Sequence, residues 1–112
     1  MVRIRPTIPF ILLTLAILSE ARDNRQTLCR VFVPDLVSRC ARYARGSGPV
    51  SSPSRECCRV IKNTDVACAC GHVNWFVERL VNMRKAVYVA RACGIKLQPG
   101  SKCGSFKIPG GN

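Results

Sequence analysis

Hydrophobic residues recur with helical spacing through most of the chain. In the segment 33–44 the apolar residues are separated by three or four positions, which is the spacing of one face of an α-helix. They are Val33, Leu36, Val37, Cys40 and Ala44. Pro34 suits the first turn of such a helix, where its missing N–H costs nothing. The Gly- and Pro-containing stretch 46–49 ends it, so the pattern predicts a first helix followed by a flexible connector over 46–52.

The same period predicts a second and a third helix. Ser52 and Pro53 have the residue types of an N-cap and a first helical position for a short second helix. The segment 63–65 (Asn-Thr-Asp) supplies the expected stop of the second helix and the cap of the third, which the pattern extends as one helix to position 80. Its apolar face consists of Val66, Ala69, Cys70, Val73, Phe76, Val77 and Leu80.

A fourth helix and a tail complete the predicted fold. Asn82 is the expected cap, and Gly94 suits the C-terminal end. The expected buried face is Met83, Ala86, Val87, Ala90 and Cys93, with Arg84, Lys85 and Arg91 outside. Residues 95–112 contain four glycines and two prolines and are predicted to be irregular. No strand alternation is present, so we expect an all-α fold of four short helices and an irregular tail.

Residues 1–21 have the features of a cleaved signal peptide. Arg3 and Arg5 precede an apolar run over 8–18, which is too short to span a bilayer. Ser19 and Ala21 place small residues where a signal peptidase inspects the chain, so we expect cleavage after Ala21. The expected product, residues 22–112, is one small, soluble, secreted domain.

All eight cysteines lie within 22–112, which in an exported chain is the pattern of a disulfide framework. They are Cys29, Cys40, Cys57, Cys58, Cys68, Cys70, Cys93 and Cys103, in the order C…C…CC…CxC…C…C. On a helix, the members of each doublet point in different directions, so each must reach a different element. A structural zinc site would need more widely spaced, converging pairs. We therefore expect no metal ion and no other cofactor.

The number and distribution of charged residues restrict the possible functions further. Residues 22–112 carry 16 basic and 5 acidic side chains. The basic residues are spread along the chain rather than collected in a tract, which favours attraction to an anionic membrane surface and gives no indication of nucleic-acid binding. His72 is the only histidine, and with every cysteine expected to be bridged no nucleophile–base pair can be assigned. We therefore do not expect an enzyme.

The cysteine order resembles the eight-cysteine motif of plant non-specific lipid transfer proteins. Their superfamily also contains cereal protease and amylase inhibitors and seed storage albumins. The CC doublet followed by CxC carries the resemblance over 29–103, and the segments 40–46 and 103–109 are also similar. The nine-residue gap between Cys58 and Cys68 is nearer the compact subfamilies.

This resemblance implies a disulfide pairing. It joins Cys40 to Cys57 and Cys58 to Cys93 in every subfamily. At the CxC doublet we favour the compact arrangement, Cys29–Cys68 with Cys70–Cys103. The long arrangement, Cys29–Cys70 with Cys68–Cys103, is the alternative.

The resemblance also implies a function. Four disulfides would hold the helices around an apolar cavity, and a monomer would bind fatty acids, phospholipids or similar ligands and transfer them outside the cell, in the cell wall or apoplast. The expected lining is Val33, Leu36, Val37, Val60, Ile61, Val73, Phe76, Val77, Leu80, Val87, Ala90, Ile95 and Ile108. The same residues could instead fill a packed core. Two other functions suit the scaffold: a cationic antimicrobial protein of plant defence, acting on membranes, and a protease or amylase inhibitor using the loop 46–54.

Overall fold

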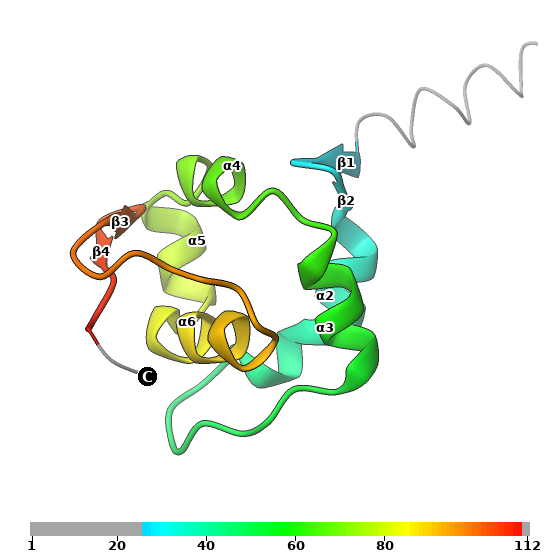
Figure 1. Ribbon diagram of the computed structural model, residues 1–112, viewed down its shortest axis with the longest axis horizontal. Helices are drawn as coiled ribbons and strands as arrows, with labels where there is room; N and C mark the ends of the chain where they lie inside the picture. The colour runs from blue at the N-terminus through cyan, green and yellow to red at the C-terminus, as the bar shows by residue number, and fades with distance from the viewer. Residues whose placement is uncertain (1–25, 111–112) are drawn as a thin grey trace, which may run out of the picture.

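Helices dominate the fold, as the sequence predicts. The computed structural model describes residues 26–110 (Figure 1), so the expected signal peptide and its cleavage point lie outside the described residues. The elements are β1 (Thr27–Leu28), β2 (Val31–Phe32), α2 (Val33–Cys40), the 3-10 turn η2 (Ala41–Tyr43), α3 (Arg55–Lys62), α4 (Val66–Gly71), α5 (Trp75–Leu80), α6 (Met83–Ala92), β3 (Lys102–Cys103) and β4 (Phe106–Lys107). The strands form two antiparallel pairs, β1 with β2 and β3 with β4. Over residues 26–110, every helix is too short or too polar to cross a bilayer.

The predicted third helix is two helices, so the described chain has five rather than four. α4 ends at Gly71, and α5 begins at Trp75. Asn74 starts the new helix because its extended backbone and its Oδ1, which accepts a hydrogen bond from Val77 N at 3.0 Å, make it an N-cap. The apolar period runs through this break without interruption, which is why the pattern conceals it.

Helices α3, α4 and α6 begin at N-cap residues of the predicted types, and one N-cap lies two residues later than predicted. Asp65 and Asn82 cap α4 and α6, each accepting a backbone hydrogen bond at 3.1 Å. Ser54, rather than Ser52, caps α3, because its Oγ accepts from Cys57 N at 3.1 Å. The connector is therefore two residues longer than expected, and Pro53 lies before the helix rather than in it.

The tail contains an ordered turn between β3 and β4. Cys103 pairs with Phe106 in this ladder, and Gly104 has a φ of +64°. A Cβ at Gly104 would lie 2.6 Å from Val73 Cγ1, so both the backbone conformation and the close approach require glycine here. The turn therefore packs directly against the connector between α4 and α5.

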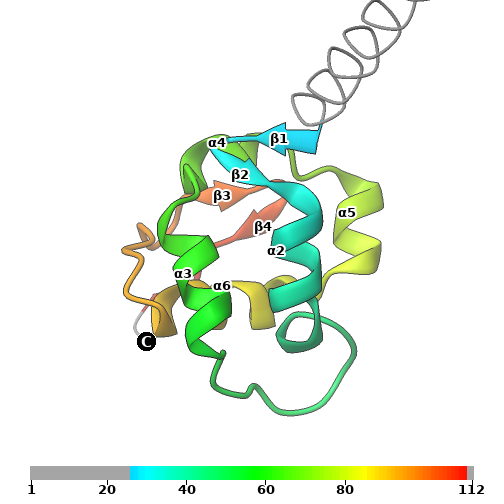
Figure 2. The ribbon, with the colours of Figure 1, turned by 90° about the vertical axis from the view of Figure 1, so that its right-hand side faces the viewer.

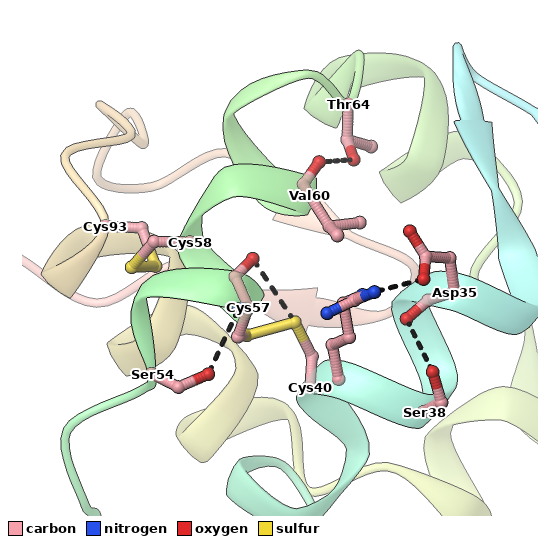
Figure 3. The surroundings of a disulfide bond; sticks show 10 residues. Asp35, Ser38, Cys40, Ser54, Cys57, Cys58, Val60, Thr64 and Cys93 are labelled. Atoms are coloured by element: carbon pink, nitrogen blue, oxygen red, sulfur yellow. Dashed lines mark hydrogen bonds and ion pairs between the residues drawn. A yellow bond between two sulfur atoms is a disulfide. The ribbon is translucent and has the colours of Figure 1, made fainter.

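Four disulfides tie these elements together: Cys29–Cys68, Cys40–Cys57, Cys58–Cys93 and Cys70–Cys103. This is the compact arrangement. Figure 3 shows how the adjacent Cys57 and Cys58 diverge from α3, one toward α2 and the other toward the end of α6. α4 diverges in the same way, toward the β1–β2 turn through Cys68 and toward β3 through Cys70. Helices α3 and α4 therefore hold every other cross-linked element.

Helix α6 is buried on two sides and separates two small cores. The first is formed by Cys40, Cys57, Val89 and Cys93, and the second by Met83, Val87, Cys103 and Ile108. Val87 and Val89 are both buried although they lie about 200° apart around the helix. The predicted single face of α6 contained Val87 but not Val89.

A buried lysine fixes the connector after η2 to α6. Lys85, expected on the outer face, is only 7% exposed, and its Nζ donates to the carbonyl oxygens of Arg45 and Ser47 at 3.0 Å each. The neighbouring carbonyls are bound by the same end of α6: Ala44 O accepts from Asn82 N, Gly46 O from Asn82 Nδ2 and Gly48 O from Arg84. Five successive carbonyls, 44–48, are thus satisfied by the start of one helix.

Replacing Lys85 with methionine keeps the length of the side chain and removes both hydrogen bonds from the ammonium group. We expect Lys85→Met to lower the free energy of unfolding by about 2 kcal/mol, because hydrogen bonds from charged donors contribute about 1.5–3 kcal/mol. Denaturant unfolding of the oxidised protein measures the change. Lys62→Met, at an exposed position of α3, is the matched control. Equal effects of the two substitutions would contradict the role assigned to Lys85.

The disulfide pairing has a direct chemical test. We expect no alkylatable thiol in the native protein, and the unreduced digest should contain a cross-linked peptide in which fragmentation places Cys29 on Cys68 and Cys103 on Cys70. Cross-linked fragments joining Cys29 to Cys70 would establish the long arrangement instead.

Candidate functional site

A pocket lined only by apolar residues opens beside the first core. Its volume is about 230 Å³, and we call it the apolar pocket. Its walls come from α2, the η2 turn, α3, the connector after α5, and α6. The lining residues are Leu36, Val37, Cys40, Ala41, Ala44, Ile61, Val81, Ala86 and Val89. Figure 2 shows α2 beside α3, with α6 below them.

Small side chains and a cross-link keep this space open. Ala41, Ala44 and Ala86 contribute one methyl group each, where larger residues would fill the volume. Cys40 lies in the wall, and its bond to Cys57 holds the end of α2 at a Cα–Cα distance of 5.0 Å from α3. A covalent link maintains this spacing without the tight packing that an uncross-linked core would need.

Three of the thirteen predicted lining residues, Leu36, Val37 and Ile61, line the apolar pocket. Val87 and Ile108 belong to the second core, and Val73 packs against it. Val60 and Ile95 line other pockets, Phe76 and Leu80 are exposed on α5, and Val33, Val77 and Ala90 are partly buried outside this lining.

Sequence reasoning missed two walls of the pocket. Val89 lies on the side of α6 opposite Val87, and its only signal was the i, i+4 spacing to Cys93 on a second apolar face. Val81 lies in an extended segment, with φ −113° and ψ 131°, between α5 and α6. No helical period identifies a residue in such a connector.

Three larger pockets among the described residues have charged linings. The first, of about 480 Å³, is bounded by Tyr88, Arg91, Lys96 and the start of the tail. The second, of about 320 Å³, lies between α2 and α3 and includes the Asp35–Arg39 ion pair at 2.7 Å (Figure 3). The third, of about 300 Å³, includes Arg84 and Arg91 of α6. The hydrogen bond and charge of Asp35 raise the pKa of Arg39 above its ordinary value, so this guanidinium stays cationic. Charged walls suit hydrocarbon less well than the apolar pocket does.

All the cysteines form disulfides, so none is available to bind a metal ion or to act as a nucleophile. Sulfur atoms of Cys29 and Cys68 and a ring nitrogen of His72 lie within 4.8 Å of one another, which is a spacing compatible with metal binding. The two sulfurs are bonded to each other, however, so neither is a thiolate that could ligate an ion. All eight cysteines are bridged, and none provides a free nucleophile.

Comparison with known proteins identifies the family. A sequence model of the family described as probable lipid transfer matches residues 10–103, a segment that contains all eight cysteines. No curated protein and no solved structure matches the chain. The family match confirms the resemblance drawn from the cysteine motif. Because the matched segment covers most of the sequence, the chain belongs to the probable lipid transfer family.

Proposed function

We propose that this protein binds the hydrocarbon chain of a fatty acid or phospholipid in the apolar pocket and carries it between sites outside the cell. The observation that carries the proposal is the lining of the pocket, in which all nine residues are apolar. Membership in the probable lipid transfer family supports the ligand class. The four disulfides support an oxidising, extracellular location.

The size of the pocket limits what enters it. At about 230 Å³ it exceeds the ~150 Å³ apolar cavity that admits benzene and falls below the ~300 Å³ at which pockets for whole small molecules begin. Part of an acyl chain therefore fits, while the headgroup stays at the surface. Each buried methylene contributes about 0.8 kcal/mol, so the affinity would grow with chain length without any polar contact. Such a site selects by size and shape rather than by headgroup.

A second candidate, a cationic protein that perturbs membranes, is favoured by the formal net charge of +12. It would use the same attraction to anionic lipid but would need no ligand inside the fold. The two functions differ in whether a lipid monomer is bound in water, away from any bilayer.

Filling the apolar pocket tests the proposed function. Ala41→Phe should weaken binding of a fluorescent fatty acid by about tenfold or more, because excluding even two methylenes removes about 0.8 kcal/mol each. The thermal midpoint should change little, since the ring enters existing space. Ala67→Phe, at an exposed position of α4, is the control and should bind the probe normally. A wild-type protein that binds no acyl probe of any length would refute the proposal and leave the inhibitor function to be tested.

Salt separates the carrier from the membrane-active candidate. Raising the salt concentration from about 0.1 M to about 1 M shortens the Debye length from about 10 Å to about 3 Å. Binding to anionic vesicles should then fall steeply, whereas binding of a fatty acid in the uncharged pocket should change less than twofold. Leakage of vesicle contents without lipid uptake would instead favour the membrane-active candidate.

A further inference from the structure

Helix α5 exposes an unusual amount of apolar surface. Trp75 is 69% exposed, Phe76 56% and Leu80 60%, all within six residues. The ring of Phe76 lies edge-on to that of Trp75, with centroids 6.0 Å apart. Large apolar groups gathered in this way on a folded surface mark an interaction site more often than isolated ones do.

An ordinary surface helix turns its apolar residues toward the core, but α5 turns its large apolar residues toward solvent. At about 100° per residue, Trp75, Arg79, Phe76 and Leu80 cover a continuous arc of about 140°, and all four are exposed. The remaining two residues, Val77 and Glu78, are partly buried.

The acidic residue of α5 is held against the protein. Glu78 Oε1 accepts a hydrogen bond from Ser105 Oγ at 2.6 Å, and Oε2 accepts one from Ser105 N at 3.3 Å. These bonds attach α5 to the β3–β4 turn. They are consistent with the orientation in which Glu78 faces the protein and the apolar and cationic residues face outward.

The chain passes from α5 directly into a wall of the apolar pocket. Val81, the residue after α5, lines that pocket, and so does Val37, which is itself 54% exposed. Docking through α5 would therefore place a lipid surface one residue along the chain from a pocket wall.

We propose that this exposed face of α5 is where the protein docks on an anionic lipid surface, a proposal that rests on the proposed lipid binding and specifies where the lipid is exchanged. Tryptophan favours the boundary between headgroups and hydrocarbon. The Arg79 guanidinium lies 5.9 Å from the centroid of the Trp75 ring and places a positive charge beside the inserted rings, where lipid phosphates would meet it.

Charge argues for a membrane rather than a second copy of the chain. Each copy carries a formal net charge of +12, so two copies repel each other, whereas an anionic bilayer attracts both. A six-residue helix also offers far less than the roughly 800 Å² per partner of a standard protein interface.

The chain contains a single tryptophan, Trp75, which makes its fluorescence a direct reporter of docking. On addition of phosphatidylglycerol vesicles we expect the emission of the oxidised protein to shift to shorter wavelength and to be quenched by lipids brominated in the acyl chain. Phosphatidylcholine vesicles should produce a much smaller shift. An unchanged emission on phosphatidylglycerol vesicles that nevertheless sediment with the protein would show that another face docks and would overturn the proposal.

A matched pair of substitutions tests the assignment to α5. Leu80→Ser should weaken vesicle partitioning by about fivefold or more, because a large apolar group no longer enters the bilayer. Leu28→Ser makes the same change at an exposed position of β1 and should alter partitioning by less than twofold. Equal losses from both variants would overturn the proposal.

A second readout separates this proposal from the proposed function. Binding of a monomeric fluorescent fatty acid, measured without vesicles, should be unaffected by Leu80→Ser, which lies outside the pocket lining. A protein that binds no fatty acid but still inserts Trp75 into vesicles would refute the carrier function and support docking by α5. A protein that binds the fatty acid while Trp75 stays in water would do the reverse.

Discussion

The four cross-links that radiate from α3 and α4 set the conditions for the rest of the molecule. Only ten apolar residues between 26 and 110 are buried, and four of these are half-cystines. A core of this size contributes little of the stability a domain needs, while disulfides typically contribute about 2–4 kcal/mol each. Because covalent bonds hold the helices at their spacing, side chains are not all required for close packing. The apolar pocket and the exposed face of α5 both depend on that freedom.

At the buried Lys85, hydrogen bonds take the place of the hydrophobic packing that the small core does not supply. The long connector between η2 and α3 has no apolar residues to pack inward along 45–48, so its carbonyl oxygens are bound by α6 instead. The bond from Asn82 N to Ala44 O holds Ala44, a residue of the pocket wall, against the start of α6. Hydrogen bonds from the start of α6 thus position the segment 44–48, which has no large apolar side chains to hold it by burial.

The sequence predicted the class of fold, a cap within 63–65, the cap at Asn82, and the family, because each depends on local chemistry or on cysteine order. It did not predict the break at Asn74, where an uninterrupted apolar period outweighed one cap residue. Nor did it predict the burial of Lys85 or the pocket wall at Val89, because α6 lies between two cores and a single hydrophobic face describes only one of them. Most expected lining residues also lie elsewhere: in or against the second core, in the linings of other pockets, or on the exposed surface of α5. Periodicity reports which side of a helix is apolar, but not whether that side faces a core, a cavity or solvent.

Helix α5 is an example of an apolar face that turns toward solvent. Phe76 and Leu80 satisfy the spacing of a buried face as well as any residues in the chain, yet they are more than half exposed. The other side of the helix is attached to the protein: Glu78 accepts hydrogen bonds from Ser105 on the β3–β4 turn, next to the Cys70–Cys103 bond and the close approach of Gly104 to Val73. A short-range pattern could not contain this information, since it depends on a residue 27 positions away. The orientation of the helix is therefore a tertiary property. The contacts that accompany it, the Glu78–Ser105 hydrogen bonds and the Cys70–Cys103 bond, join residues that lie far apart in the sequence.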